Sequence, residues 1–154
     1  MNSVYDIADW FLCAVDRESG DVITHLKLQK LLYYAQAWSL VLLDRPMFNA
    51  EIQAWTHGPV VPVIFRKYAD YKMENIPTPD NCPQDIGKEV EEVLQDVMRT
   101  YGIYEAKYLE KLTHQEEPWK EARKGLPLEA RCNNIISLVT MKEFYNKMQT
   151  GELN

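Results

Sequence analysis

The sequence predicts a compact, mainly α-helical fold with a small β-hairpin or other short β element. Apolar residues recur at intervals of three and four along most of the chain, as in amphipathic helices. No repeat, low-complexity tract or interdomain linker divides it, so residues 1–154 are expected to form a single domain. A chain of 154 residues, 46% of them hydrophobic, is long enough to bury a core of its own.

Two helices are expected in the N-terminal third of the chain. Ser3 and Asp6 provide the start of the first, since a serine side chain accepts a free amide and an acidic residue suits the first turn. Its apolar face is Val4, Ile7, Ala8, Phe11, Leu12 and Val15. Ser19-Gly20 ends this region, and Thr24 caps the second helix. The stripe of that second helix is Leu28, Leu31, Leu32, Ala35, Trp38 and Leu42, widened by Tyr34 and Val41, which predicts a central position.

The β element is expected just after Arg45-Pro46, where the second helix ends. Met47-Phe48 and residues 53–55 flank a polar stretch, which predicts a short hairpin or two paired extended segments. Gly58-Pro59 then turns the chain, and Pro62 starts a short helix.

Helices separated by loops are expected in the second half as well. Residues 77–83 read as a proline-rich loop, and a strongly amphipathic helix follows from Ile86 to Tyr101, stopped by Gly102. Residues 104–112 predict a helix that buries Tyr108, Leu109 and Leu112, and Pro118 starts a turn carrying Trp119 and Ala122. After an extended Ile135-Ile136, Ser137 caps a last helix through Met148.

Composition limits the functional classes. A net charge of −6 and a pI near 5.1 have the wrong sign for gripping a phosphate backbone, so no nucleic-acid partner is expected. Cys13, Cys82 and Cys132 are widely spaced, and no secretory signal precedes them, which predicts reduced thiols in a cytoplasmic protein. The most apolar stretch, residues 35–43, is too short to span a bilayer, so no membrane association is expected.

No catalytic or metal-binding constellation is visible, and no cofactor is expected. His25, His57 and His114 are scattered, and His114 with Glu117 would supply only two ligands. Nucleophile elbows and phosphate-binding glycine loops are absent from the sequence. A hydrolase or metalloenzyme that uses His57, His114 and a cysteine brought together in space stays open as the weakest alternative.

Several other residues admit both a structural and a functional interpretation. Lys27 and Lys30 fall on the polar side of an apolar helix, where they either cover apolar surface or bind a partner's carboxylate or phosphate. Trp55 is either core or an interface anchor. Gly58-Pro59 is either a simple turn or a rigid ledge that presents Trp55 and His57.

Three segments resemble one protein family when they are read together. These are Leu26 to Tyr34 (LKLQKLLYY), Ala54 to Pro62 (AWTHGPVVP), and Leu112-Thr113-His114 followed by Pro118-Trp119. Their order is similar to that of the Panacea domain, a family that includes SocA-like antitoxins and phage-associated GepA-like proteins. The resemblance runs from about Val22 to Ala122. It implies a non-enzymatic antitoxin that neutralises a co-encoded toxin by direct protein–protein contact, or alternatively an adaptor that delivers the toxin to a bacterial protease.

The resemblance also marks candidate recognition residues. The positions that either stabilise the fold or contact the partner are Lys27, Lys30, Trp55, His57, Gly58, Pro59, His114, Pro118 and Trp119. Lys27 and Lys30 are expected to be the foremost exposed members of this set. A protein toxin is the expected partner, with a protease as a second partner under the adaptor alternative, while self-association is not indicated either way.

Overall fold

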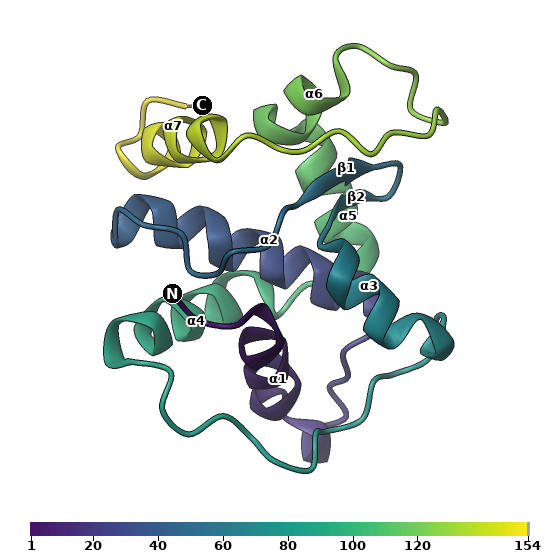
Figure 1. Ribbon diagram of the computed structural model, residues 1–154, viewed down its shortest axis with the longest axis vertical. Helices are drawn as coiled ribbons and strands as arrows, with labels where there is room; N and C mark the ends of the chain where they lie inside the picture. The colour runs from purple at the N-terminus through teal and green to yellow at the C-terminus, as the bar shows by residue number, and fades with distance from the viewer. Residues whose placement is uncertain (154) are drawn as a thin grey trace.

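The computed structural model describes residues 1–153 and confirms a mainly α-helical fold. Within that range it contains seven α-helices and one two-stranded antiparallel sheet (Figure 1). The helices are α1 (Val4–Ala14), α2 (His25–Leu42), α3 (Pro62–Tyr68), α4 (Lys88–Tyr101), α5 (Ala106–Gln115), α6 (Glu117–Arg123) and α7 (Leu138–Gln149). Two 3₁₀ turns, η1 (Arg17–Ser19) and η2 (Ala69–Tyr71), and the strands β1 (Gln53–Trp55) and β2 (Gly58–Val60) complete the fold.

The central position predicted for α2 is confirmed. Helix α2 crosses the middle of the molecule, with α7 on one side and α1 and α4 on the other (Figure 1). Leu28, Leu31, Leu32 and Ala35 are fully buried. Leu42 was expected in the same stripe but is 43% exposed, because it lies in the last turn of α2.

Side-chain caps predicted from the sequence start three helices. The Ser3 hydroxyl accepts a hydrogen bond from the Tyr5 amide at 3.2 Å, and the Thr24 hydroxyl accepts one from Lys27 at 3.3 Å. Ser137 does the same for the Thr140 amide at 3.2 Å. Each cap satisfies an amide that has no partner within its own helix, which fixes where the helix begins.

The expected hairpin exists, but the predicted pairing partner was wrong. Strand β1 pairs with β2, with Gln53 opposite Val60 and Trp55 opposite Gly58, so the loop is only Thr56-His57. Gly58 makes this tight turn feasible, because its φ of +107° is a conformation that side-chain-bearing residues rarely adopt. Met47 and Phe48 instead donate their backbone amides to the side-chain oxygen of Gln36.

The extended segment predicted at Ile135-Ile136 lies along the other edge of β1. The Ala54 amide donates to the Asn134 carbonyl at 2.9 Å, and the Ile136 amide donates to the Ile52 carbonyl at 2.8 Å. The chain that follows α6 therefore returns to the hairpin before α7 begins. This return brings residues 131–133 next to residues of the second motif.

The prediction of three reduced thiols was wrong for two of them. Cys13, near the end of α1, and Cys82, in the irregular segment before α4, form a disulfide, while Cys132 is free. The two cysteines are 69 residues apart in the chain, so spacing gave no sign of the contact. Ile76 and Ile86, which lie before and after Cys82 in the chain, are buried. The disulfide and these two side chains together attach the long loop to the core.

The C-terminal helices form close to the predicted positions, but α4 and α5 each begin two residues later than expected, and Leu112 is half-buried where burial was expected. Gly102 does follow the end of α4, and Leu109 is buried in α5. Tyr108 was expected to be buried but is 47% exposed, where its ring packs against Tyr104 with centroids 4.3 Å apart. Among residues 1–153, no helix combines the length and the apolarity needed to cross a bilayer.

Candidate interaction site

The three sequence motifs meet at one place, where α2, the hairpin and the α5–α6 segment converge. We call the residues at its centre the buried junction: Gln29, Lys30, Gly58, Thr113, Trp119 and Arg123. Gln29 accepts the Val61 amide at 2.7 Å, and the Lys30 ammonium donates to the Pro59 carbonyl at 3.2 Å. Just outside the junction, the Lys27 ammonium donates to the Gly102 carbonyl at 2.7 Å. The polar residues of α2 thus hold other segments in place.

Lys30 is not the exposed residue that the sequence predicted. Its side chain is fully buried and makes no ion pair with any residue in 1–153. Burial lowers the pKa of Lys30 to about 7; the charge of Glu110 opposes this effect and that of Lys107 adds to it. The expectation of an exposed Lys30 was wrong because the hairpin covers the polar side of α2, on which Lys30 lies.

Gly58 is required by Lys30 as well as by the turn. A Cβ atom placed on Gly58 would lie 2.6 Å from Cε of Lys30 and 3.0 Å from Oγ1 of Thr113. Both distances are closer than the normal approach of such atoms. The Gly-Pro pair therefore serves the structural role that the sequence left open, because it lets α2 approach the hairpin.

Trp119 links the third motif to the second. Its indole N–H donates to the Trp55 carbonyl at 2.8 Å, and the ring of His114 stacks on it with centroids 4.1 Å apart. Burial lowers the pKa of His114, and the charge of Lys30 adds to that shift while Glu110 opposes it. Pro118 occupies the first turn of α6 and is buried, so it sets the position of Trp119.

Arg123 is a junction residue that the sequence analysis missed. Its guanidinium lies over the Trp119 ring and donates to the carbonyls of Ala54 at 3.0 Å, Pro127 at 2.9 Å and Ala130 at 2.7 Å. Only 2% of the residue is exposed. A single arginine in a helix carries no sequence signal of such a role, because Ala54 lies far from it in the chain and its other acceptors belong to the irregular loop that follows α6.

A second buried cluster surrounds Glu116. The hydroxyls of Tyr34 and Tyr145 donate to the same carboxylate oxygen at 2.6 and 2.9 Å, and the hydroxyls of Tyr33 and Tyr145 lie 2.9 Å apart. Burial raises the pKa of Glu116, and the two tyrosine hydrogen bonds oppose that rise. Glu116 lies within the third sequence motif, and that position is the sequence feature that could have indicated its role. Since the cluster is closed to solvent, we assign it to fold stability.

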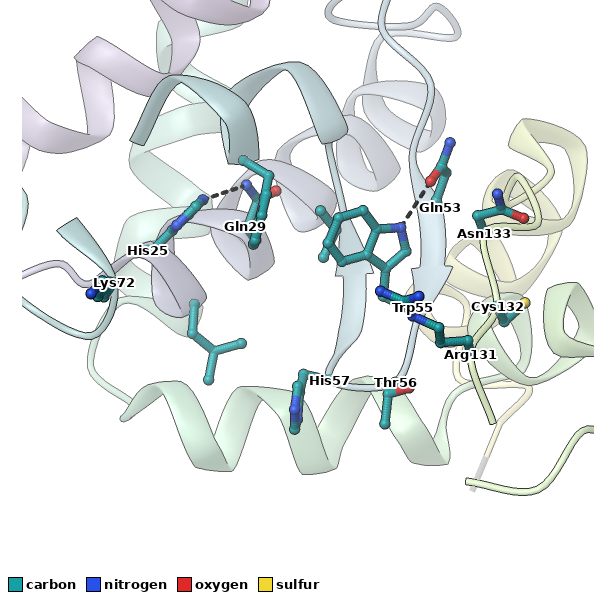
Figure 2. A pocket seen from close by; sticks show the side chains of 13 residues that line it. His25, Gln29, Gln53, Trp55, Thr56, His57, Lys72, Arg131, Cys132 and Asn133 are labelled. Carbon is teal, nitrogen blue, oxygen red and sulfur yellow. Dashed lines mark hydrogen bonds between the residues drawn. The ribbon is translucent and has the colours of Figure 1, made fainter. Parts of the chain in front are cut away.

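The open side of the hairpin carries a pocket of about 750 Å³ (Figure 2). Its wall is aromatic: the ring of Phe65 lies 4.9 Å from that of Trp55 and 4.6 Å from that of His25. The Trp55 indole N–H is held by Gln53 at 2.8 Å, which fixes the ring plane. Burial lowers the pKa of His25, with a smaller contribution from the charge of Lys30.

The rim of this pocket is polar and cationic. His57 lies at the hairpin tip, where its Nδ1 is 2.9 Å from a carboxylate oxygen of Glu110. Lys72 and Arg131 are exposed on the rim, and neither side chain makes an ion pair or hydrogen bond with another residue in the described range 1–153. Within that range no aspartate or glutamate lines the pocket.

The structure therefore divides the predicted site residues between two places. Trp55 and His57 line the pocket, whereas Lys30, Gly58, Pro59, His114, Pro118 and Trp119 lie in or against the buried junction. Lys27, in α2, is half-buried where its ammonium group contacts the residue that follows α4. In the part of the chain that the structure describes, no three His, Cys, Asp or Glu side chains are grouped to hold a metal ion.

These observations define a mainly α-helical protein with one hairpin. Buried polar contacts hold the hairpin on one side, and a pocket lies on its other side. The chain belongs to the family described as "Antitoxin SocA-like, Panacea domain", whose model matches residues 28–120, more than half of the chain. Antitoxin SocA of Caulobacter vibrioides (strain NA1000 / CB15N) is 47% identical to it over 47 residues, which are 30% of this chain and 25% of that protein. No solved structure matches the chain.

Proposed function

We propose that this protein is an antitoxin that neutralises a co-encoded protein toxin by binding it directly, without catalysing a reaction. Membership of the SocA-like Panacea family is the observation that carries the proposal. The aromatic pocket beside the hairpin supplies a surface suited to it, since tryptophan and arginine are the residues that most often dominate binding energy at interfaces.

The proposed mechanism is occupation of the toxin. An antitoxin that binds only the active toxin lowers the free toxin concentration by mass action. The net charge of −6 would attract a basic toxin surface at long range and speed the encounter. We place this encounter in the cytoplasm, where both chains would be synthesised together.

Co-expression with the adjacent reading frame tests the proposal. We expect the neighbour to arrest growth when expressed alone, growth to recover when this protein is co-expressed, and the two chains to co-purify. A neighbour that is harmless alone, or equally toxic in the presence of this protein, would contradict the antitoxin role. Growth rescue without co-purification or any other measurable complex would contradict direct binding.

Toxin turnover in the same cells separates occupation from delivery to a protease. If occupation is sufficient, the toxin's half-life is unchanged or longer when growth is rescued. If this protein acts as an adaptor, the half-life shortens and rescue is lost in a strain that lacks the protease. The second result would replace occupation by the adaptor mechanism.

A further inference from the structure

We propose that the pocket beside the hairpin binds an acidic, extended peptide segment of the partner. An apolar side chain of that segment would sit against Trp55 and Phe65, and its carboxylates would face Lys72 and Arg131. The inference deepens the proposed function, and rests on it, because the partner in question is the toxin.

The first step concerns the charge of the pocket against that of the whole chain. The chain has 23 acidic and 17 basic residues, yet the described residues that line the pocket include Lys72 and Arg131 and no carboxylate. A cationic pocket on an acidic protein selects a local anionic group even where the rest of the surface repels one. Because Lys72 and Arg131 have no partner within residues 1–153, they are available to a ligand.

The second step concerns the arrangement of the two cations. Figure 2 shows Lys72 at one end of the pocket and Arg131 at the other, with His25 and Trp55 between them. A compact anion such as phosphate is normally held by donors that converge on one point. Separated cations flanking an aromatic wall instead fit an elongated ligand with anionic groups along its length and an apolar group between them.

The third step concerns the donors and acceptors that the pocket offers to a backbone. Asn133 lines it together with the Thr56-His57 loop, and its side-chain amide has no hydrogen-bond partner among residues 1–153, whereas the Gln53 amide is already paired with Trp55 and Glu51. A volume of about 750 Å³ has room for more than one side chain of a peptide. Ligand sites that combine an apolar wall with a few polar groups commonly have volumes of roughly 300–1,000 Å³.

The test begins without the toxin. The purified full chain is used to select from a phage-displayed library of random peptides, and selected sequences are remade as fluorescent peptides for anisotropy measurements. We expect peptides that combine Asp or Glu with an aromatic or large aliphatic residue, bound more weakly at high salt. Enrichment of basic or uncharged peptides, absence of enrichment, or competition by inorganic phosphate at constant ionic strength would each overturn the proposal.

Charge reversal on the rim locates the binding. The double variant Lys72→Glu/Arg131→Glu should weaken the selected acidic peptide by at least about tenfold, since it turns two attractive contacts into repulsive ones. Lys88→Glu/Lys147→Glu is the matched control: both lysines are exposed, on α4 and α7, neither lines the pocket, and the net charge changes equally. Equal weakening in both doubles would show a general charge effect and would overturn the pocket assignment.

The same two double variants, tested in the growth-rescue assay, distinguish a failure of this inference from a failure of the proposed function on which it rests. Loss of rescue in the rim variant, with rescue kept in the control, supports both. Rescue by the rim variant at wild-type level would leave the antitoxin role standing and overturn the pocket as the toxin site. A harmless neighbouring reading frame would remove the antitoxin role, while peptide selection would still report on the pocket chemistry.

Discussion

The two sides of one hairpin differ in how their polar groups are used. On the inner side, Lys30 and Arg123 are buried and donate to backbone carbonyls of distant segments. On the outer side, Lys72 and Arg131 are exposed, and among residues 1–153 they have no side-chain partner. The inner basic side chains position the hairpin, whereas the outer ones remain free to meet a ligand.

The family match includes parts of both sides of the hairpin. It covers residues 28–120, which contain Lys30, Gly58, Thr113 and Trp119 of the junction and also Trp55 and Lys72 of the pocket. Arg123 of the junction lies outside the match, as do His25 and residues 131–133 of the pocket. Part of the proposed recognition surface is therefore contributed by segments beyond the match.

The largest expected difference in stability is between variants of Arg123 and Arg131. Arg123→Ala should lower the free energy of unfolding by about 4 kcal/mol, because it leaves buried carbonyls without donors and removes a packed side chain. Arg131→Ala should change it by no more than about 0.5 kcal/mol, as expected for an exposed residue whose side chain makes no ion pair or hydrogen bond within residues 1–153. Urea unfolding followed by circular dichroism measures both. Similar losses in the two variants would remove the distinction between the two sides.

Gly58 tests how closely α2 approaches the hairpin. Gly58→Ala should destabilise the fold by about 3 kcal/mol, since strain at φ +107° adds to the clash with Lys30 and Thr113. Gly20→Ala is the control, because Gly20 has φ +93° and no atom within 4 Å of the added methyl group, so only the strain of about 1 kcal/mol applies. Equal unfolding midpoints for the two variants would contradict the close approach.

Lys30 should give stability a specific pH dependence. Its pKa falls from 10.5 to about 7 on folding, so between these values the unfolded chain binds a proton that the folded chain lacks. Stability should therefore rise with pH across this window, by up to about 1.4 kcal/mol per pH unit from this group.

Replacing the buried amine isolates that contribution. Lys30→Met should show a smaller slope of unfolding free energy between pH 7 and about 9 than the wild type, because it no longer carries the titrating group. Lys147→Met, at an exposed position of α7, should keep the wild-type slope. Parallel pH profiles for wild type and Lys30→Met would show that Lys30 is not buried in solution.

Smaller losses of stability than those at Arg123 and Gly58 are expected at the two motif histidines. His114→Ala should cost about 1.5 kcal/mol, because the ring stacks on Trp119 inside the fold. His57→Ala should cost less than about 1 kcal/mol, since its contact with Glu110 involves an imidazole that is 69% exposed. Thermal unfolding of both variants checks the order, and a larger loss for His57→Ala would reverse the assignment of the two residues.

More of the fold than of the site could be predicted from the sequence. Helix positions came from periodicity and caps at Ser3, Thr24 and Ser137, all of which are local features. The strand partner of β1 was missed because Gly58-Pro59 was interpreted as a turn after the hairpin, when it forms the second strand. The burial of Lys30 could not be inferred, since an amine on a polar helix face looks the same whether water or a hairpin covers it.

The sequence by itself determined the helices, the presence of a short β element and the family, because each depends on residues close together in the chain or on motifs in a fixed order. Tertiary structure alone decided the Cys13–Cys82 disulfide, the hydrogen bond from Arg123 to the Ala54 carbonyl and the pocket that joins Trp55 to Arg131. These contacts bring together residues that are far apart in sequence, and neither composition nor spacing records which distant segments will pack against each other.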